Sequence, residues 1–269
     1  MIKIAVAGCC GKMGRRIVSL AKEDKAVSVV GASEASGHPL IGKDVGDVLG
    51  LGAMNVTITD NIDEALKGAD CFIDFTAPIA TLSHVEYALR LKKAMVIGTT
   101  GMTQNEEKKI REASAHIPIV FSPNMSIGVN LLFGLVGEVA RELGDAYQIE
   151  IVEAHHKHKK DSPSGTAMKL AQVIAQAKGL DLDKAAVYGR HGQGLSRPDK
   201  EIGIHAVRTG DIVGEHTVIY CGTGERIEIT HKAHSRDTFA MGAIHAAKFV
   251  AGKKPGLYSM QDVIKNRNQ

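Results

Sequence analysis

Tryptophan is missing from this sequence, and cysteine, aromatic residues and net charge are all scarce. The 269 residues include 4 Cys and 4% aromatic residues, and the formal net charge is only +3. Four cysteines are too few for a disulfide scaffold, which favours a reducing cytoplasm. We do not expect nucleic acid as a partner, because single-strand binders stack bases on aromatic side chains within a basic groove. A small acidic ligand fits the charge better.

Long apolar runs are also missing. The first eight residues form one short apolar stretch that leads into a glycine turn, and no run of about 20 apolar residues follows. We therefore expect neither a signal peptide nor a membrane span, and a cytoplasmic protein. Hydrophobic residues still make up 44% of the chain, enough for a core in one large or two modest domains.

Strand-length apolar runs alternate with helical patterns in the first half of the chain. The expected strands are 2–7, 27–33, 55–59, 71–76, 94–98 and 117–122, and the expected helices are 15–22, 63–67, 78–92 and one that starts at a capping box, Thr103 to Glu106. Such alternation is typical of α/β proteins and predicts a Rossmann-like, doubly wound parallel sheet of six strands.

The pattern changes after Asn124. Helices are expected at 126–143, 164–178 and 238–250, strands at 147–153, 202–208, 215–220 and 226–230, and a loop-like segment at 181–200. This order predicts a second, α+β domain in which the last three strands pair antiparallel.

Three glycines, Gly8, Gly11 and Gly14, lie between the first strand and the first helix. Glycines there let the backbone approach a pyrophosphate, whose charge the helix N-terminus attracts. Glu34 follows 20 residues after Gly14, where a carboxylate can accept hydrogen bonds from an adenine ribose. A plain turn is the alternative. Ala35 offers no cation to a ribose 2′-phosphate, which favours NADH, although Lys12 is available to such a phosphate.

Two later turns follow expected strands at the same edge of the sheet. Gly98–Gly101 and Ser122–Met125 are placed to line the nicotinamide end of a cofactor site, or are ordinary turns. Cys9 and Cys10, inside the glycine loop, are interpreted as packing residues, with redox sensitivity as the alternative.

A basic stretch precedes the helix expected at 164–178. It holds His155, His156 and His158 among three lysines and ends in Ser164-Gly165-Thr166. Adjacent histidines point apart and the lysines repel a cation, so no metal site is expected. A cationic loop that leads to a helix N-terminus suits a di-acid, and an imidazole is the natural proton donor near neutral pH. We expect the lysines to lower the pKa of His155 in the empty site.

Together these motifs resemble the dihydrodipicolinate reductase family. Residues 150–167 contain its signature, E-x-x-E-x-H-H-x-x-K-x-D-x-P-S-G-T, and the resemblance extends over essentially the whole chain through Gly8–Gly14, Ile73–Thr76, Gly98–Gly101, Asn124 and 208–216. It implies reduction of 4-hydroxy-tetrahydrodipicolinate to tetrahydrodipicolinate, with loss of water and hydride transfer from NADH or NADPH, in lysine biosynthesis through diaminopimelate.

The resemblance also implies roles for individual residues. His155 matches the proton donor and Lys159 a second catalytic residue, while His156, Gly165 and Thr166 match substrate contacts. The implied cofactor contacts are Gly8, Cys9, Cys10, Gly11, Lys12, Met13, Glu34, Gly98, Thr99, Thr100, Ser122, Pro123, Asn124 and Met125. Ala35 and Ala77 stand where some members carry Arg, which leaves NADH preference or dual use open.

The implied architecture has two domains in a homotetramer. Residues 1–125, completed by 238–269, would bind the dinucleotide, and 126–237 would bind the substrate and form the tetramer. A nicotinamide-sensing binding protein on the same fold is the alternative, but a sensor has no need of His155 and Lys159. An amino-acid dehydrogenase leaves the stretch from His155 to Thr166 unexplained.

Overall fold

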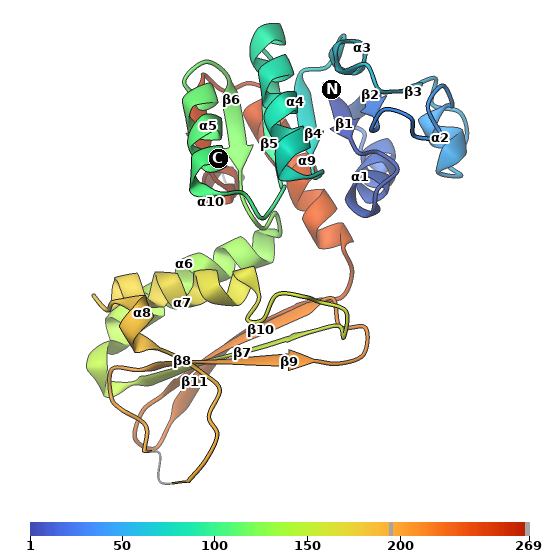
Figure 1. The fold of residues 1–269 in the computed structure, drawn as a ribbon. Helices are drawn as coiled ribbons and strands as arrows, with labels where there is room; N and C mark the ends of the chain where they lie inside the picture. The colour runs from blue at the N-terminus through green and yellow to red at the C-terminus, as the bar shows by residue number, and fades with distance from the viewer. Residues whose placement is uncertain (194–195, 267–269) are drawn as a thin grey trace. The chain divides into compact units, whose positions relative to one another are not determined.

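The computed structural model describes residues 1–193 and 196–266, which form two compact units (Figure 1). Unit 1 combines Met1–Ile127 with the segment from Arg236 onward, and unit 2 is Gly128–Ser235. Among the described residues no helix has the length and apolar character needed to cross a membrane.

Unit 1 contains a seven-stranded sheet in which every paired neighbour is parallel, in the order β12-β6-β5-β4-β1-β2-β3. The strands are β1 (Ile2–Ala7), β2 (Val27–Ser33), β3 (Ile58–Thr59), β4 (Cys71–Asp74), β5 (Ala94–Ile97), β6 (Pro118–Phe121) and β12 (Gly256–Tyr258). The predicted parallel sheet is confirmed, but the prediction of six strands was one short. The seventh, β12, has only three residues, too few to show an alternating pattern.

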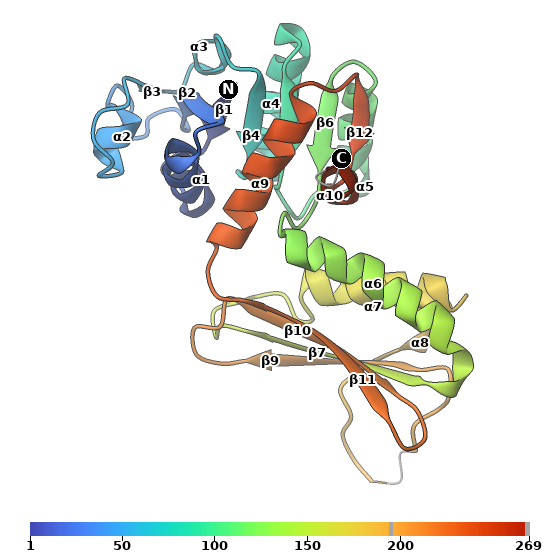
Figure 2. The ribbon, with the colours of Figure 1, turned by 180° about the vertical axis from the view of Figure 1, so that it is seen from behind.

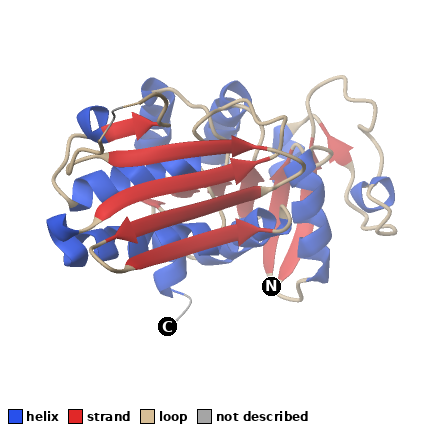
Figure 3. Ribbon diagram, turned by 90° about the horizontal axis from the view of Figure 1, so that it is seen from below, coloured by secondary structure: helices blue, strands red, loops and turns tan. Residues whose placement is uncertain are grey.

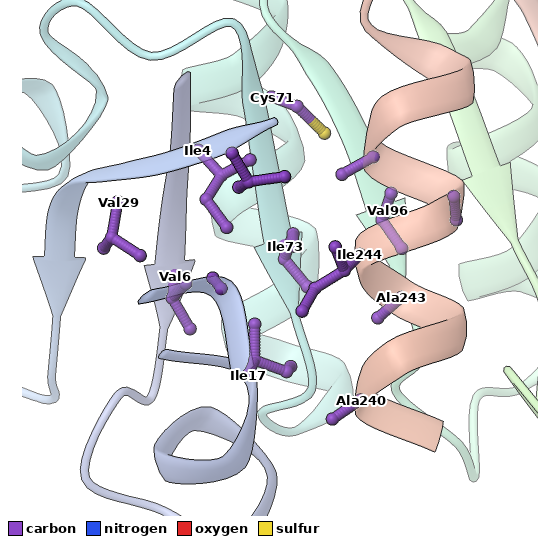
Figure 4. Close-up of a cluster of buried hydrophobic side chains, with 14 of the residues drawn as sticks. Ile4, Val6, Ile17, Val29, Cys71, Ile73, Val96, Ala240, Ala243 and Ile244 are labelled. Carbon is purple, nitrogen blue, oxygen red and sulfur yellow. The ribbon is translucent and has the colours of Figure 1, made fainter. Parts of the chain in front are cut away.

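Helices cover both faces of this sheet. α1 (Lys12–Glu23), α9 (Asp237–Val250) and α10 (Met260–Asn266) pack on one face, and α3 (Ile62–Leu66), α4 (Pro78–Leu91) and α5 (Gln104–Ser114) on the other (Figure 2). Strand residues Ile4, Ile73 and Val96 face Ala243 and Ile244 of α9 (Figure 4). The one further helix assigned in this unit among the described residues is α2 (Val45–Val48).

The start of α5 follows the expected capping box. The Thr103 hydroxyl accepts from the Glu106 amide at 3.3 Å, and the Glu106 carboxylate accepts from the Thr103 amide at 2.7 Å. The two residues thus satisfy each other's backbone donors, which confirms the predicted helix start.

Unit 2 is built on a five-stranded sheet in the order β11-β10-β7-β9-β8. Its strands are β7 (Gln148–His155), β8 (Ala186–Tyr188), β9 (Ile202–Arg208), β10 (Gly214–Cys221) and β11 (Arg226–Ala233). α6 (Ile127–Leu143) and α7 (Gly165–Ala177) pack on one face of the sheet. A 3₁₀ turn (Gly144–Ala146) and α8 (Leu182–Ala185) complete the elements of this unit. Figure 3 shows the strands of the unit 2 sheet in front of its helices.

Two expectations for this unit were wrong. β10 and β11 pair antiparallel, but β9 runs parallel to both β7 and β8. The reason is that β7 lies between β9 and β10, so these two strands, although consecutive in sequence, are not neighbours in the sheet. Residues 181–200, expected to be loop-like, include α8 and β8, whose short lengths give little periodic signal.

The connection from β9 to β10 crosses the carboxyl end of β7. The Thr209 amide donates to the His155 carbonyl at 2.9 Å, and the His156 amide donates to the Ile212 carbonyl at 2.8 Å. This crossing fixes the backbone at the start of the basic stretch.

Candidate functional site

The glycine loop in unit 1 turns sharply between β1 and α1. Gly8 has a left-handed φ of +60°, and a Cβ on Gly14 would lie 2.1 Å from the Gly8 carbonyl oxygen, so only glycine fits at position 14. α1 starts after Gly11 without a side-chain cap. Its positive N-terminal end is therefore suited to an anion such as a phosphate.

Glu34 directly follows β2 and lies against this loop. Its Oε1 accepts from the Cys10 amide at 2.7 Å, and its Oε2 accepts from the Ala35 amide at 3.3 Å. The structure thus brings together the loop and the carboxylate that the sequence had paired for a dinucleotide.

Cys9 and Cys10 place their sulfur atoms 3.8 Å apart. With Glu34 they bring three potential metal-ligand atoms within 4.8 Å of one another. Burial is the main reason that the pKa of each thiol is raised, so the thiolate that a metal needs is disfavoured. Cys9 lies within the hydrophobic core of unit 1, which supports its interpretation as a packing residue.

The two later turns lie at the same edge of the sheet, after β5 and β6. Thr99 and Ser122 are buried, and the Ser122 hydroxyl donates to the Asn124 carbonyl at 2.8 Å. Thr100 and Pro123 are exposed. The Met125 side chain packs into the core, which leaves its backbone as the part that can meet a ligand.

His155 is the last residue of β7 and is buried beside Glu153. Residues two apart on a strand share a face, and the Glu153 Oε2 lies 2.6 Å from the His155 Nδ1. A Cβ on Gly214 would lie 3.0 Å from the other ring nitrogen, Nε2. Glu153 thus fixes one side of the ring, and glycine at 214 leaves room beside the other.

Arg208 and Ser164 complete the surroundings of the fully buried Glu153. Arg208 donates to both carboxylate oxygens at 2.8 Å, and the Ser164 amide donates to Oε1 at 2.9 Å. Burial acts to raise the pKa of Glu153, but the hydrogen bonds from Arg208, His155 and Ser164 outweigh it and hold that pKa below its ordinary range. The carboxylate is therefore ionised at neutral pH.

The pKa of His155 is lowered, as the sequence analysis expected. Burial is the largest cause, Glu153 opposes it, and the charges of Lys159 and Arg208 add to the lowering. The sequence analysis attributed the lowering of this pKa to the lysines, but Lys159 contributes less to it than burial does.

His216, on β10, ends the 208–216 stretch that contributes to the family resemblance, but the sequence analysis assigned it no role. It lies opposite Glu153 in the strand pairing, and burial is the main reason that its pKa falls to about 3. Its Nε2 is 3.0 Å from the Ser164 hydroxyl oxygen, which also accepts from the Ala167 amide at 3.2 Å. The hydroxyl of Ser164, the N-cap of α7, is therefore held between the first turn of that helix and the neutral His216 imidazole.

The remaining predicted residues of unit 2 follow the Glu153–His155 pair in the chain. Gly165 and Thr166 form the first turn of α7, and a Cβ on Gly165 would meet open space. Lys159 lies 2.8 Å from Asp161, and the buried His156 Nδ1 has no hydrogen-bond partner within the described part of the chain. Unit 2 thus gathers an oriented imidazole, cationic groups and a helix N-terminus at one end of its sheet.

Sequence signals for the missed residues differ in strength. The spacing of Glu153 and His155 indicates a shared face on any strand. Arg208 and His216 lie more than 50 residues further along the chain and are brought in only by the pairing of β9 and β10 with β7.

Known proteins resemble the chain over nearly its full length. The family model "Dihydrodipicolinate reductase, N-terminus" matches residues 2–125, and "Dihydrodipicolinate reductase, C-terminus" matches residues 128–264. The 4-hydroxy-tetrahydrodipicolinate reductase of Geotalea uraniireducens is 50% identical over 264 residues, covering 98% of this chain and 99% of the relative. That of Syntrophotalea carbinolica is 49% identical with the same coverage.

Solved structures give the same picture. A dipicolinate-bound dihydrodipicolinate reductase from Paenisporosarcina sp. TG-14 has a TM-score of 0.72 at 25% identity, covering 96% of this chain and 97% of the other. An amine dehydrogenase from Mycobacterium smegmatis, 12% identical with a TM-score of 0.62, shares the fold alone.

Proposed function

Since the chain belongs to the dihydrodipicolinate reductase family, whose members are NAD(P)H-dependent oxidoreductases, we propose that it reduces 4-hydroxy-tetrahydrodipicolinate to tetrahydrodipicolinate with loss of water, in the diaminopimelate route to lysine. The observation in the structure that carries this proposal is the buried Glu153–His155 pair beside the N-terminus of α7.

His155 is the proton donor. In its protonated form the Nδ1–H is held by Glu153, so the second proton, on Nε2, is the one that can be transferred. Hydride addition to a conjugated imine builds negative charge, and a positioned acid neutralises it. Lys159 supports this step as the second catalytic residue, because its charge is felt at His155.

The substrate is a small dicarboxylate. Its carboxylates would be held by the amides of Gly165 and Thr166 at the start of α7, and by His156, whose Nδ1 is buried without a partner among the described residues. The cations of the 157–160 segment offset the charge of the substrate.

The residues of unit 1 fit a dinucleotide. The Gly8–Met13 loop would hold the pyrophosphate and Glu34 the adenine ribose, with 98–100 and 122–125 near the nicotinamide. When bound, the reduced nicotinamide supplies the hydride. A Cβ at position 14 would collide with Gly8, as expected of a loop that needs close backbone approach.

Cofactor choice follows from Glu34 and Ala35. The Glu34 carboxylate would repel a ribose 2′-phosphate, and neither Ala35 nor Ala77 offers a cation to it. NADH preference or dual use is therefore proposed.

Assembly and location complete the proposal. Unit 1 would bind the dinucleotide, and unit 2 would bind the substrate and form a cytoplasmic homotetramer. The half-exposed apolar side chain of Val207, on β9, supports an interface on the sheet face opposite α6 and α7, because contact with another subunit would bury it.

The test is the loss of nicotinamide absorbance when the protein meets substrate freshly made from pyruvate and aspartate semialdehyde, with NADH and NADPH in parallel. Oxidation with a faster NADH rate is expected. Cofactor binding without any oxidation would contradict the reductase and favour a nicotinamide-sensing protein.

A further inference from the structure

We infer that Asp74, together with His84, is a positioning residue for the cofactor site, an inference that rests on the proposed function. Asp74 ends β4, a strand that lies between β1 and β5 in the sheet. Its side chain is completely buried. A buried carboxylate at the ligand-binding edge of a sheet, outside the residues expected to touch the cofactor, needs an explanation, because removing such a charge from water is costly.

The carboxylate of Asp74 joins three segments of unit 1. Its Oδ1 accepts from the Thr76 amide at 2.8 Å and from the Thr76 hydroxyl at 2.6 Å, and it lies 3.4 Å from the Thr99 hydroxyl. Its Oδ2 lies 2.7 Å from the Nδ1 of His84, on α4. The turn after β4, the turn after β5 and α4 are therefore held by one side chain.

A second hydroxyl strengthens the link to the turn after β5. The fully buried Thr81, on α4, lies 2.8 Å from the Thr99 hydroxyl. Thr99 thus has partners on two sides, and its position depends on the Asp74 cluster, which we define as Asp74, Thr76, Thr81, His84 and Thr99.

The cluster also reaches the glycine loop. A Cβ on Gly8 would lie 3.0 Å from the Thr76 Cγ2, so the Thr76 methyl group rests against Gly8. Because the Thr76 hydroxyl is bound to Asp74, the rotamer that directs this methyl group to Gly8 is fixed. Asp74 therefore sets the spacing between the glycine loop and Thr99, two parts of the proposed cofactor site, without being exposed to the cofactor.

This role makes a prediction that a merely structural role does not make. A structural carboxylate affects unfolding and every kinetic constant together. A positioning carboxylate affects the binding of the dinucleotide and leaves the substrate site in unit 2 unchanged.

Two variants of Thr76 separate its hydroxyl group from its methyl group. Thr76→Val keeps the shape and removes the hydroxyl, while Thr76→Ser keeps the hydroxyl. We expect Thr76→Val to raise the Kd for NADH about tenfold, as for the loss of a hydrogen bond to a charged group. Thr76→Ser keeps that bond and loses only the methyl contact with Gly8, so it should raise the Kd less, about three- to fourfold. The change in NADH fluorescence on binding measures the Kd.

Two controls accompany these variants. Dipicolinate, the dicarboxylate bound in the Paenisporosarcina structure, probes the substrate site by calorimetry, and its Kd should not change in Thr76→Val. Ser114→Ala removes another buried hydroxyl of unit 1, one that donates to the Arg111 carbonyl on α5, and should leave the Kd for NADH unchanged.

The outcomes are distinct. The inference is overturned if Thr76→Val binds NADH as the wild type does, or if it weakens NADH and dipicolinate binding alike. It is also overturned if Thr76→Ser is as impaired as Thr76→Val. A wild-type protein that binds NADH but oxidises none with the substrate would instead contradict the proposed function.

Discussion

Each unit of the molecule contains a buried carboxylate whose oxygen lies against the Nδ1 of a histidine. In unit 1 the pair is Asp74–His84, at 2.7 Å, and in unit 2 it is Glu153–His155, at 2.6 Å. Both carboxylates are completely buried near the carboxyl end of a strand. The pairs differ in how the rest of the negative charge is compensated.

Glu153 is bound by the guanidinium of Arg208, whereas the other partners of Asp74 are an amide and hydroxyl groups. Burial acts to raise the pKa of Asp74, but the bonds from His84 and Thr76 outweigh it and lower that pKa. With Arg208 in place, Glu153 keeps a charged partner when His155 gives up its proton. The cation beside Glu153–His155 thus makes that pair suitable for proton transfer. The Asp74–His84 pair has no such cation among the described residues and is suited to holding its neighbours in position.

The largest expected effect comes from removing the histidine of the proton-transfer pair. His155→Ala should lower kcat about 10² to 10⁴-fold, the usual contribution of a general acid, while the Kd for NADH stays unchanged. Steady-state kinetics at saturating NADH measure the first and fluorescence the second. A His155→Ala protein that retains more than a tenth of the wild-type kcat would remove the distinction between the two pairs.

The second largest expected effect is the loss of stability when Arg208, the cation beside Glu153, is removed. Arg208→Met leaves Glu153 buried without its charged partner, so the free energy of unfolding should fall by about 3 kcal/mol. Urea unfolding measures it. The matched control is Arg90→Met, because Arg90 binds Asp63 at the surface and such pairs contribute about 1 kcal/mol or less. Equal losses in the two variants would show that Arg208 is an ordinary surface partner.

His216 should make stability depend on pH. Its folded pKa of about 3 lies below an unfolded value of about 6.5, so the stabilisation is present above the unfolded pKa and is lost as the pH falls toward the folded pKa. Between pH 7 and pH 5 this one residue should reduce the free energy of unfolding by about 2 kcal/mol.

Urea unfolding at the two pH values tests this for His216→Gln, which should lose less stability than the wild type over that interval. His116→Gln, a change at an exposed histidine of unit 1, serves as the control and should follow the wild type. Parallel curves for His216→Gln and the wild type would assign the loss to other groups.

The smallest expected effect is confined to unit 1. Ala35→Arg, beside Glu34, should raise kcat/KM for NADPH about three- to tenfold by offering a cation to the 2′-phosphate, with KM for the substrate unchanged. Initial rates with both cofactors measure it. An unchanged NADPH to NADH ratio would show that position 35 does not contribute to cofactor choice.

Much of the cofactor side could be predicted from the sequence. The order of strands and helices places the ends of parallel strands at one edge, so the glycine loop and Glu34 were expected together, and they meet through the Cys10 amide. The short strand β12 was missed because three residues show no periodicity.

The surroundings of His155 were predicted only in part. Local spacing indicates the Glu153–His155 pair, but Arg208 and His216 reach it through strand pairings that no local pattern specifies. The same nonlocal pairing explains why the expectation of an antiparallel β9 was wrong. Sequence reasoning therefore selected His155, the proposed proton donor, and missed the groups that orient it and compensate its partner.

Unit 1 is interrupted in the sequence, and this has a consequence for synthesis on the ribosome. Its first 127 residues emerge well before α9, the helix that covers Ile4, Ile73 and Val96 in the finished unit. Unit 2 lies entirely within that interval, so it is the first to be complete. Until α9 follows, α1 is in place on this face of the nascent sheet, but the part formed by Ile73 and Val96 lacks the helix that buries it.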